Sequence, residues 1–269
     1  MNLKKIINLV SNVQKISAPD PDNAVETIID SVLRKNILFF DNLTPIIKLP
    51  VHYQRISNIE VEVLIFNLLD SKAQITVSNL QIKEAIKRIR FSPQLQIDLT
   101  EEFWRGQFYV NLAHGIYDIM HQKLVPMRNK LVFDYFINIR YLPHRKLEDA
   151  PVFKKYVESS IGMEQFECLM RVLGYSISSL TKGRKAFAFY GIGRTGKSTI
   201  LNVLEAVIGG GLVSHEPFHT MSGERAKAHY EGKRVNISRE TSTKVNRNEE
   251  SFKSLISCEY TTGSEKFEK

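Results

Sequence analysis

Apolar residues recur every three to four positions along several stretches of this chain, which is the spacing of a helix with one buried face. The first stretch ends at the proline-containing segment 19–22, which breaks a helix. Ser57 and Ser78 each stand before a later stretch, as expected for residues that cap a helix. The pattern predicts helices over residues 2–16, 22–35, 58–70, 79–90, 151–160 and 163–178.

Short runs of apolar, β-branched and aromatic residues lie between these helices and predict strands. The predicted strands are 37–40, 45–49, 107–112, 115–118 and 130–141. Residues 37–95 therefore read as a compact, largely helical module, and residues 96–146 turn toward short strands.

The C-terminal part of the chain has a different order of an apolar run, a glycine-rich loop and an amphipathic helix. The run 186–190 predicts a buried strand, and Ile200, Leu204 and Ile208 share one face of the helix after the loop. Gly209 begins a run of glycines that ends this helix. The further strands predicted here are 212–214 and 235–237.

The loop between strand and helix reads GIGRTGKS and fits G-x-x-x-x-G-K-[ST], the pattern of a phosphate-binding P-loop. Glycines let backbone N–H groups turn toward a phosphate where a Cβ atom would obstruct its approach. In this pattern Lys197 reaches the β- and γ-phosphates, Ser198 gives its hydroxyl to Mg²⁺, and the helix N-terminus faces the anion. The predicted nucleotide-binding residues are Gly191, Ile192, Gly193, Arg194, Thr195, Gly196, Lys197, Ser198 and Thr199.

A P-loop ATPase also needs a carboxylate at the end of a neighbouring strand, where it holds the Mg²⁺ hydration shell and orients the attacking water. Glu240 ends the strand predicted at 235–237 and is the candidate for this role; an exposed strand-end glutamate is the alternative. Arg239 stands where many such sites have a second acid. Lys197 and Glu240 are thus the predicted catalytic residues, and Ser198 and Glu240 the predicted metal ligands.

Charge, cysteine content and the length of apolar runs indicate what kind of partner the chain binds and in which compartment it works. A formal net charge of +8 over 269 residues favours a polyanionic partner, because Lys and Arg that neutralise phosphates release counterions. The two cysteines, Cys168 and Cys258, lack disulfide-framework or zinc-site spacing, which suggests a reducing cytoplasm. No apolar run approaches the roughly 18 residues of a transmembrane helix, so we expect no membrane partner.

The stretch His215-Glu216-Pro217-Phe218-His219 matches the zinc-protease pattern H-E-x-x-H, which needs a helix to bring both histidines to one metal. Pro217 disfavours that helix, and the residues before His215 read as a strand. We therefore set zinc chemistry aside.

The order of these motifs resembles the superfamily 3 replicative helicases of phages, plasmids and poxviruses. The resemblance rests on the strand, loop and helix around 191–199, on GKRVNISRE ending at Glu240, on residues 111–126, and on Leu-Gly-Tyr at 173–175. It covers residues 95–269 and, faintly, 38–95. Thr195 departs from the pattern, because the family usually has Asn before Gly-Lys.

This resemblance implies an α/β fold with a P-loop NTPase domain, whose AAA+-like parallel sheet carries flanking helices, over residues 161–269. A smaller mixed α+β domain at 37–160 and an N-terminal helical segment at 1–36 would precede it. The implied activity is that of an ATPase and DNA helicase that uses ATP and Mg²⁺ to move along DNA as a homo-oligomeric, hexameric ring. Lys253 and Lys266 match the positions of a basic residue and a β-hairpin that contact DNA in the central channel.

The family's polar sensor residue and arginine finger would come after Lys269, so we expect either a fragment of a longer helicase or a truncated relative. Two alternatives follow: a nucleotide- or DNA-binding module that does not hydrolyse ATP, and a P-loop enzyme that does not act on DNA.

Overall fold

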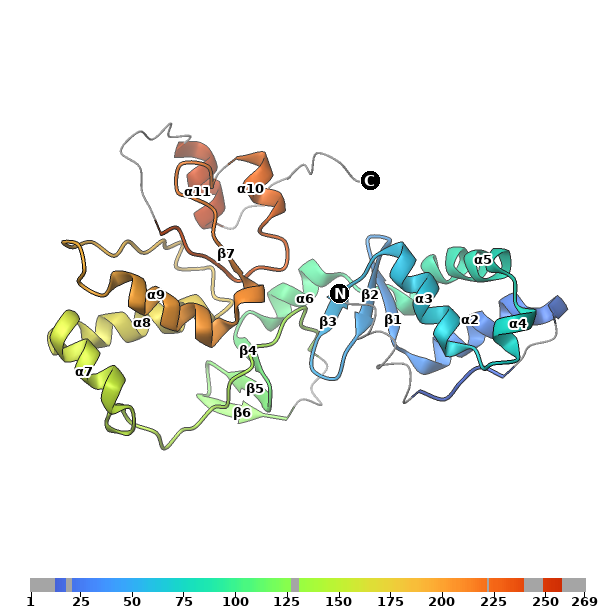
Figure 1. The fold of residues 1–269 in the computed structure, drawn as a ribbon, viewed down its shortest axis with the longest axis horizontal. Coiled ribbons are helices and arrows are strands. Elements are labelled where there is room, and N and C mark those ends of the chain that lie inside the picture. Colours follow the sequence, from blue (N-terminus) through green and yellow to red (C-terminus); the bar gives the residue numbers. More distant parts are fainter. Residues whose placement is uncertain (1–12, 18–20, 127–130, 222, 240–248, 258–269) are drawn as a thin grey trace. The chain divides into compact units, whose positions relative to one another are not determined.

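A computed structural model describes residues 13–17, 21–126, 131–221, 223–239 and 249–257 of the chain (Figure 1). The chain divides into two compact units. Unit 1 comprises Met1–Trp104 with Leu131–Tyr135, and unit 2 comprises Arg105–Lys130 with Phe136–Lys269. Each unit contains a hydrophobic core of its own.

Unit 1 combines helices with a small antiparallel sheet of order β1-β2-β3. The strands are β1 (Leu38–Asp41), β2 (Thr44–Lys48) and β3 (Tyr53–Arg55). The helices are α2 (Ala24–Lys35), α3 (Asn58–Leu68), α4 (Ala73–Thr76), α5 (Asn79–Arg90) and α6 (Leu99–Gly106), with 3₁₀ turns η1 (Pro21–Asn23) and η2 (Pro93–Leu95). Helix α6 runs across the division into unit 2.

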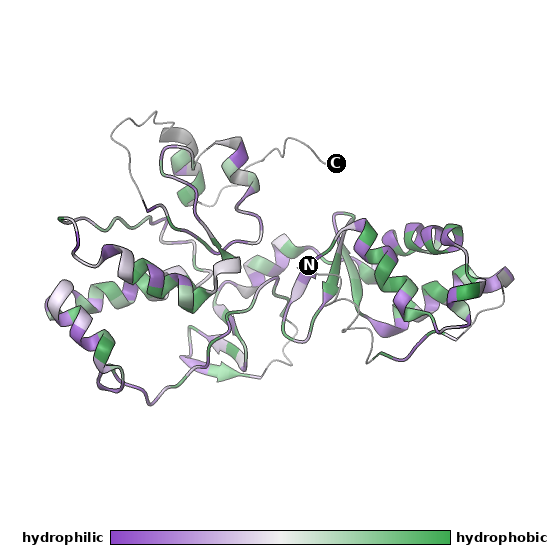
Figure 2. Cartoon of the chain, viewed as in Figure 1, coloured by the Kyte–Doolittle hydropathy of each residue, from purple (hydrophilic) through white to green (hydrophobic). Residues whose placement is uncertain are grey.

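Helices α3 and α5 begin where the sequence predicted. The Ser57 hydroxyl accepts a hydrogen bond from the Glu60 N–H while the Glu60 side chain accepts one from the Ser57 N–H, and Ser78 with Gln81 does the same. Hydrophobic and hydrophilic residues are interleaved along these helices (Figure 2), so each helix can bury one side. The largest fully buried side chains are all in unit 1: Ile28, Leu38, Phe40, Ile46, Ile47, Leu64, Ile65, Leu68, Leu69, Ile89 and Leu95.

Unit 2 contains a second antiparallel sheet, β4 (Tyr109–Leu112), β5 (Gly115–Asp118) and β6 (Lys123–Val125), and a parallel pair, β7 (Val213–Ser214) and β8 (Val235–Asn236). Its helices are α7 (Pro151–Ser160), α8 (Phe166–Ile177), α9 (Lys197–Ile208), α10 (Glu224–Ala228) and α11 (Glu249–Ser257), with 3₁₀ turns η3 (Leu147–Asp149), η4 (Met163–Gln165) and η5 (Gly210–Leu212). The core residues are Val157, Leu169, Leu173, Ile200, Leu204, Ile208, Val213 and Ile237. This core joins α7, α8 and α9 to the parallel pair.

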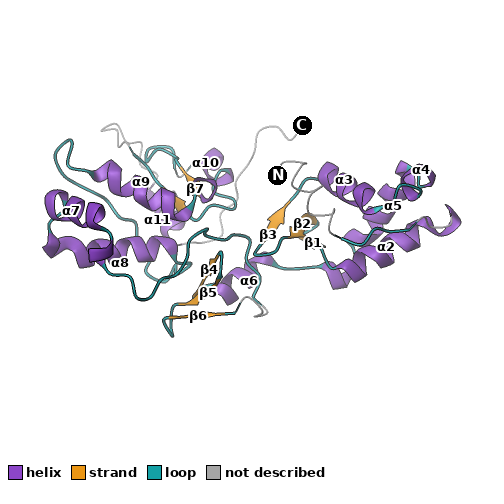
Figure 3. Ribbon diagram, turned by 60° about the horizontal axis from the view of Figure 1, so that its bottom comes forward, coloured by secondary structure: helices purple, strands orange, loops and turns teal. Residues whose placement is uncertain are grey.

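Most of the predicted helices and several strands are confirmed, and the described residues form a mixed α/β protein (Figure 3). The sequence pattern did not predict α4, α6, α10, α11, β3 or β6, which are short or carry polar residues. The helix predicted at 2–16 is wrong at its end, because Ile16 instead pairs with Leu69 in a β-bridge; residues 2–12 lie outside the described residues. The division into three domains at 1–36, 37–160 and 161–269 stays a prediction. Among the described residues, no helix has both the length and the hydropathy to cross a membrane.

The strand predicted at 130–141 is wrong, since no strand is assigned within 131–141. The first part of this segment makes backbone hydrogen bonds with unit 1 and the second part with unit 2. Phe133 accepts a backbone hydrogen bond from Tyr53 in unit 1 (2.7 Å), whereas Ile137 pairs with β4 of unit 2 through Asn111 (2.8 Å) and Ala113 (3.1 Å). A segment whose partners change in this way cannot form one continuous ladder.

The strand predicted at 186–190 is also wrong, because residues 185–191 have no regular secondary structure. Their side chains are largely exposed, with Phe187 at 42% and Tyr190 at 101% of full exposure. A strand needs a neighbouring strand for its backbone hydrogen bonds. Among the described residues β7 pairs with β8, and neither pairs with 186–190.

Candidate functional site

The glycine-rich loop leads directly into the first turn of α9, as the sequence predicted. Helix α9 begins at Lys197, and the residue before it, Gly196, has a φ of +82°, a left-handed conformation that glycine adopts without strain. The Gly196 carbonyl accepts hydrogen bonds from the N–H groups of Thr199 (2.9 Å) and Ile200 (3.2 Å). The first N–H groups of a helix have no partner within it, so this end of α9 attracts an anion.

The ammonium group of Lys197 lies inside the arc of the loop. Its Nζ donates to the carbonyls of Gly191 (2.9 Å) and Ile192 (2.6 Å) and to the Thr195 hydroxyl (3.2 Å). Thr195 in turn donates its hydroxyl to the Ile192 carbonyl (2.9 Å). The loop is therefore folded around a positive charge that is partly exposed and can turn to a bound phosphate.

Tyr156 of α7 supports the loop at its last glycine. The Tyr156 hydroxyl donates to the Gly196 carbonyl at 2.8 Å. A Cβ atom added to Gly196 would lie 2.7 Å from Cε2 of the Tyr156 ring, closer than real Cβ contacts come. Glycine at 196 is thus required both by the backbone conformation and by the neighbouring ring.

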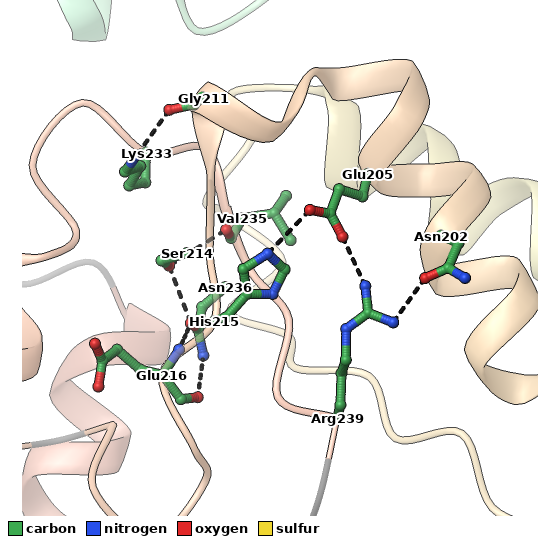
Figure 4. Close-up of polar contacts among 10 residues, drawn as sticks. All are labelled: Asn202, Glu205, Gly211, Ser214, His215, Glu216, Lys233, Val235, Asn236 and Arg239. Carbon is green, nitrogen blue, oxygen red and sulfur yellow. Dashed lines mark hydrogen bonds and ion pairs between the residues drawn. The ribbon is translucent and has the colours of Figure 1, made fainter.

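The segment after β8 is tied to α9 through Arg239 (Figure 4). Ser198, Asn202 and Glu205 are spaced four and three residues apart, so they lie along one face of the helix. Arg239, three residues after β8, donates to Asn202 Oδ1 (2.6 Å) and pairs with Glu205 Oε2 (2.6 Å). His215 contacts the other oxygen of Glu205 at 3.0 Å. Arg239 therefore binds two side chains of α9, a contact that its position in the sequence did not predict.

Asn236 links β7 and β8 through its side chain. Its Oδ1 accepts from the Ser214 hydroxyl (2.9 Å) and from the Glu216 N–H (2.8 Å), and its Nδ2 donates to the Glu216 carbonyl (3.1 Å). The backbone adds a hydrogen bond from Ile237 N–H to the Ser214 carbonyl (2.8 Å). One amide thus satisfies three polar groups and fixes the register of a pair that is only two residues long.

We expect Asn236→Ala to destabilise unit 2 by about 1–3 kcal/mol, because it leaves half-buried donors and acceptors without partners. Denaturant unfolding of the full chain measures the loss. The matched control is Asn202→Ala, which removes an exposed amide and its one hydrogen bond from Arg239 and should cost less, about 1 kcal/mol at most. Equal losses in the two variants would show that Asn236 has no special role.

The remaining predicted site residues fall in three groups. The loop residues and Ser198 and Thr199 come together at the start of α9. Lys253 is exposed on α11. Glu240 and Lys266 lie outside the described residues. No sequence motif pointed to Tyr156, because its position depends on how α7 packs in unit 2.

The H-E-x-x-H stretch forms no helix, as Pro217 led us to expect. Its first histidine contacts Glu205, and Glu216 instead accepts from His229 of the following segment (2.5 Å). His215 and Glu216 therefore take part in separate contacts.

A family model matches the C-terminal part of the chain. The model of a family of unknown function (DUF5906) matches residues 189–269. This range includes the loop, α9, β7 and β8. No curated protein matches the chain.

Proposed function

We propose that this chain is the nucleotide-binding part of an ATP-dependent replicative DNA helicase of superfamily 3, from a phage, plasmid or other mobile element. The observation that carries the proposal is the loop 191–196, folded around the Lys197 ammonium at the N-terminus of α9.

The residues of the loop fit a polyphosphate with Mg²⁺. The Lys197 ammonium and the start of α9 are both positive, and Ser198 offers an exposed hydroxyl. A Cβ on Gly191 would point toward Lys197 Nζ at 4.0 Å, on the inner side of the arc where a ligand would approach. Glycine keeps that side open.

In the proposed reaction, water would attack the γ-phosphorus of ATP and ADP would leave, and a bound Mg²⁺ would supply positive charge to the phosphates. Lys197 exchanges the carbonyls of Gly191 and Ile192 for phosphate oxygens. Ser198 would give its hydroxyl to the metal, and Glu240 would act as the acidic partner that orients water. The resulting turnover would drive a hexameric ring along DNA in a cytoplasmic replication complex.

Steady-state phosphate release from ATP, with and without single-stranded DNA, tests this function. Release that DNA stimulates supports the helicase. ATP binding without release favours a non-hydrolysing nucleotide- or DNA-binding module, and release that ignores DNA favours a P-loop enzyme acting elsewhere. Failure to bind ATP·Mg²⁺ contradicts all three.

We expect single-stranded DNA to bind with little sequence preference and with an affinity that falls as salt rises. A plot of log affinity against log salt has a negative slope, and each phosphate contact adds about 0.7 to its magnitude for a single strand. Lys253→Ala with Lys266→Ala should therefore reduce the magnitude of the slope by about 1.4. Fluorescence anisotropy over a salt series measures it.

The control for that experiment is the pair Lys48→Ala and Lys123→Ala, which removes two exposed lysines from strands and causes the same change in net charge. A slope that falls equally in both double variants would mean that general charge, and not the channel positions, attracts the DNA.

A further inference from the structure

We propose that Tyr156 is a positioning residue for nucleotide binding, which holds Gly196 and the first turn of α9 in the anion-binding conformation before the ligand arrives. This inference rests on the proposed function, because it concerns the same loop. It assigns a role to a helix that precedes the loop by about forty residues of chain and shares no motif with it.

The first step is that α7 is firmly placed. Val157, the neighbour of Tyr156, is fully buried in the core of unit 2 with Leu169 of α8 and Ile200 of α9. The Tyr156 ring itself packs against this core, and its centroid is 6.2 Å from that of Phe153. The phenol is thus held by the core that also anchors α9.

The second step is that Tyr156 contacts Gly196 in two ways. Its hydroxyl gives the Gly196 carbonyl a third hydrogen bond, in addition to those from Thr199 and Ile200. Its ring covers the Cα of Gly196, where a Cβ would lie 2.7 Å from Cε2 and 3.1 Å from the hydroxyl. Tyr156, which lies outside the loop, therefore fixes the orientation of the Gly196 carbonyl just before α9.

The third step is that the other hydrogen bonds of the loop come from within it, since those given above stay within 191–200. The irregular segment 185–191 that enters the loop is held by ring packing, with the ring centroid of Phe187 5.6 Å from that of Tyr175 of α8 and Phe189 against the core. A loop that becomes ordered only when the ligand binds weakens binding, because the entropic cost of ordering it makes the binding free energy less favourable. Tyr156 reduces that cost by ordering the loop beforehand.

The phenol keeps the proton that this role needs. Burial raises the pKa of Tyr156 above its ordinary value, and the hydrogen bond at the start of α9 opposes this rise only in part. The hydroxyl therefore remains a donor at neutral pH and through the mildly alkaline range.

The test compares Tyr156→Phe with the wild-type chain in calorimetric binding of ATP·Mg²⁺, ADP·Mg²⁺ and inorganic tripolyphosphate. Loss of one hydrogen bond should lower the affinity for all three ligands by a similar factor, on the order of tenfold. The matched control is Tyr230→Phe, which removes a hydroxyl that also donates to a carbonyl, that of Met221 (2.6 Å). Tyr230→Phe should leave the affinities within about twofold.

Hydrogen exchange of the ligand-free chain gives a second readout. The Thr199 and Ile200 amides, which bond to the Gly196 carbonyl, should exchange faster in Tyr156→Phe than in the wild type and Tyr230→Phe. Unchanged affinity and unchanged exchange would overturn the proposal, as would equal losses in both variants. If the wild-type chain binds no phosphate ligand, the proposed function fails, while the exchange rates still decide whether Tyr156 orders the loop.

Discussion

Replacing Lys197 with alanine should abolish detectable binding of ATP·Mg²⁺. The variant loses the ammonium that reaches the phosphates, and each hydrogen bond to a charged group contributes about 1.5–3 kcal/mol. Two such bonds correspond to a loss of affinity on the order of 10² to 10⁴. The arc around Gly191 and Ile192 also loses the group that now holds it. Isothermal titration calorimetry measures the change.

Lys233→Ala is the matched control for this substitution. Lys233 lies in the same unit and also donates from Nζ to a backbone carbonyl, that of Gly211 at 2.7 Å (Figure 4). Its replacement should leave nucleotide affinity within about twofold of the wild type, since it is not part of the loop motif. Equal ATP·Mg²⁺ affinity in wild type and Lys197→Ala would show that the loop is not the nucleotide site.

Phe40→Ala should destabilise unit 1 by about 3–5 kcal/mol and leave the nucleotide site intact. Phe40 is fully buried in β1, and truncating a buried phenylalanine removes transfer free energy and leaves a cavity. The core that contains Phe40 belongs to unit 1, whereas α9 packs in the core of unit 2. The single tryptophan, Trp104, also belongs to unit 1, so its fluorescence follows the unfolding of that unit.

The same substitution in unit 2, Phe187→Ala, serves as the control. Phe187 is 42% exposed and should contribute about 1 kcal/mol or less. Denaturant titration followed by Trp104 fluorescence measures the loss in unit 1, and ATP·Mg²⁺ titration below the transition shows whether the nucleotide site is affected. A parallel loss of nucleotide binding in Phe40→Ala would mean that the two units fold as one.

The sequence by itself determined five of the helices before the loop and the place where the loop meets α9. Helical spacing and local caps gave α3 and α5 their starts, because Ser57 with Glu60 and Ser78 with Gln81 satisfy the first turns within four residues of chain. The start of α9 at Lys197 also followed from the loop pattern, since Gly196 can adopt the left-handed conformation that precedes the helix. These features depend on neighbours in sequence.

The tertiary structure alone decided which segments become strands and which residues support the loop. Apolar character at 186–190 predicted a strand, but a strand also needs hydrogen-bonding partners from distant segments, and the described strands do not provide them there. Tyr156 and Arg239 likewise meet Gly196 and Glu205 across about forty and thirty-four residues of chain. Such contacts follow from how helices pack, and the spacing of residues along the chain does not predict them.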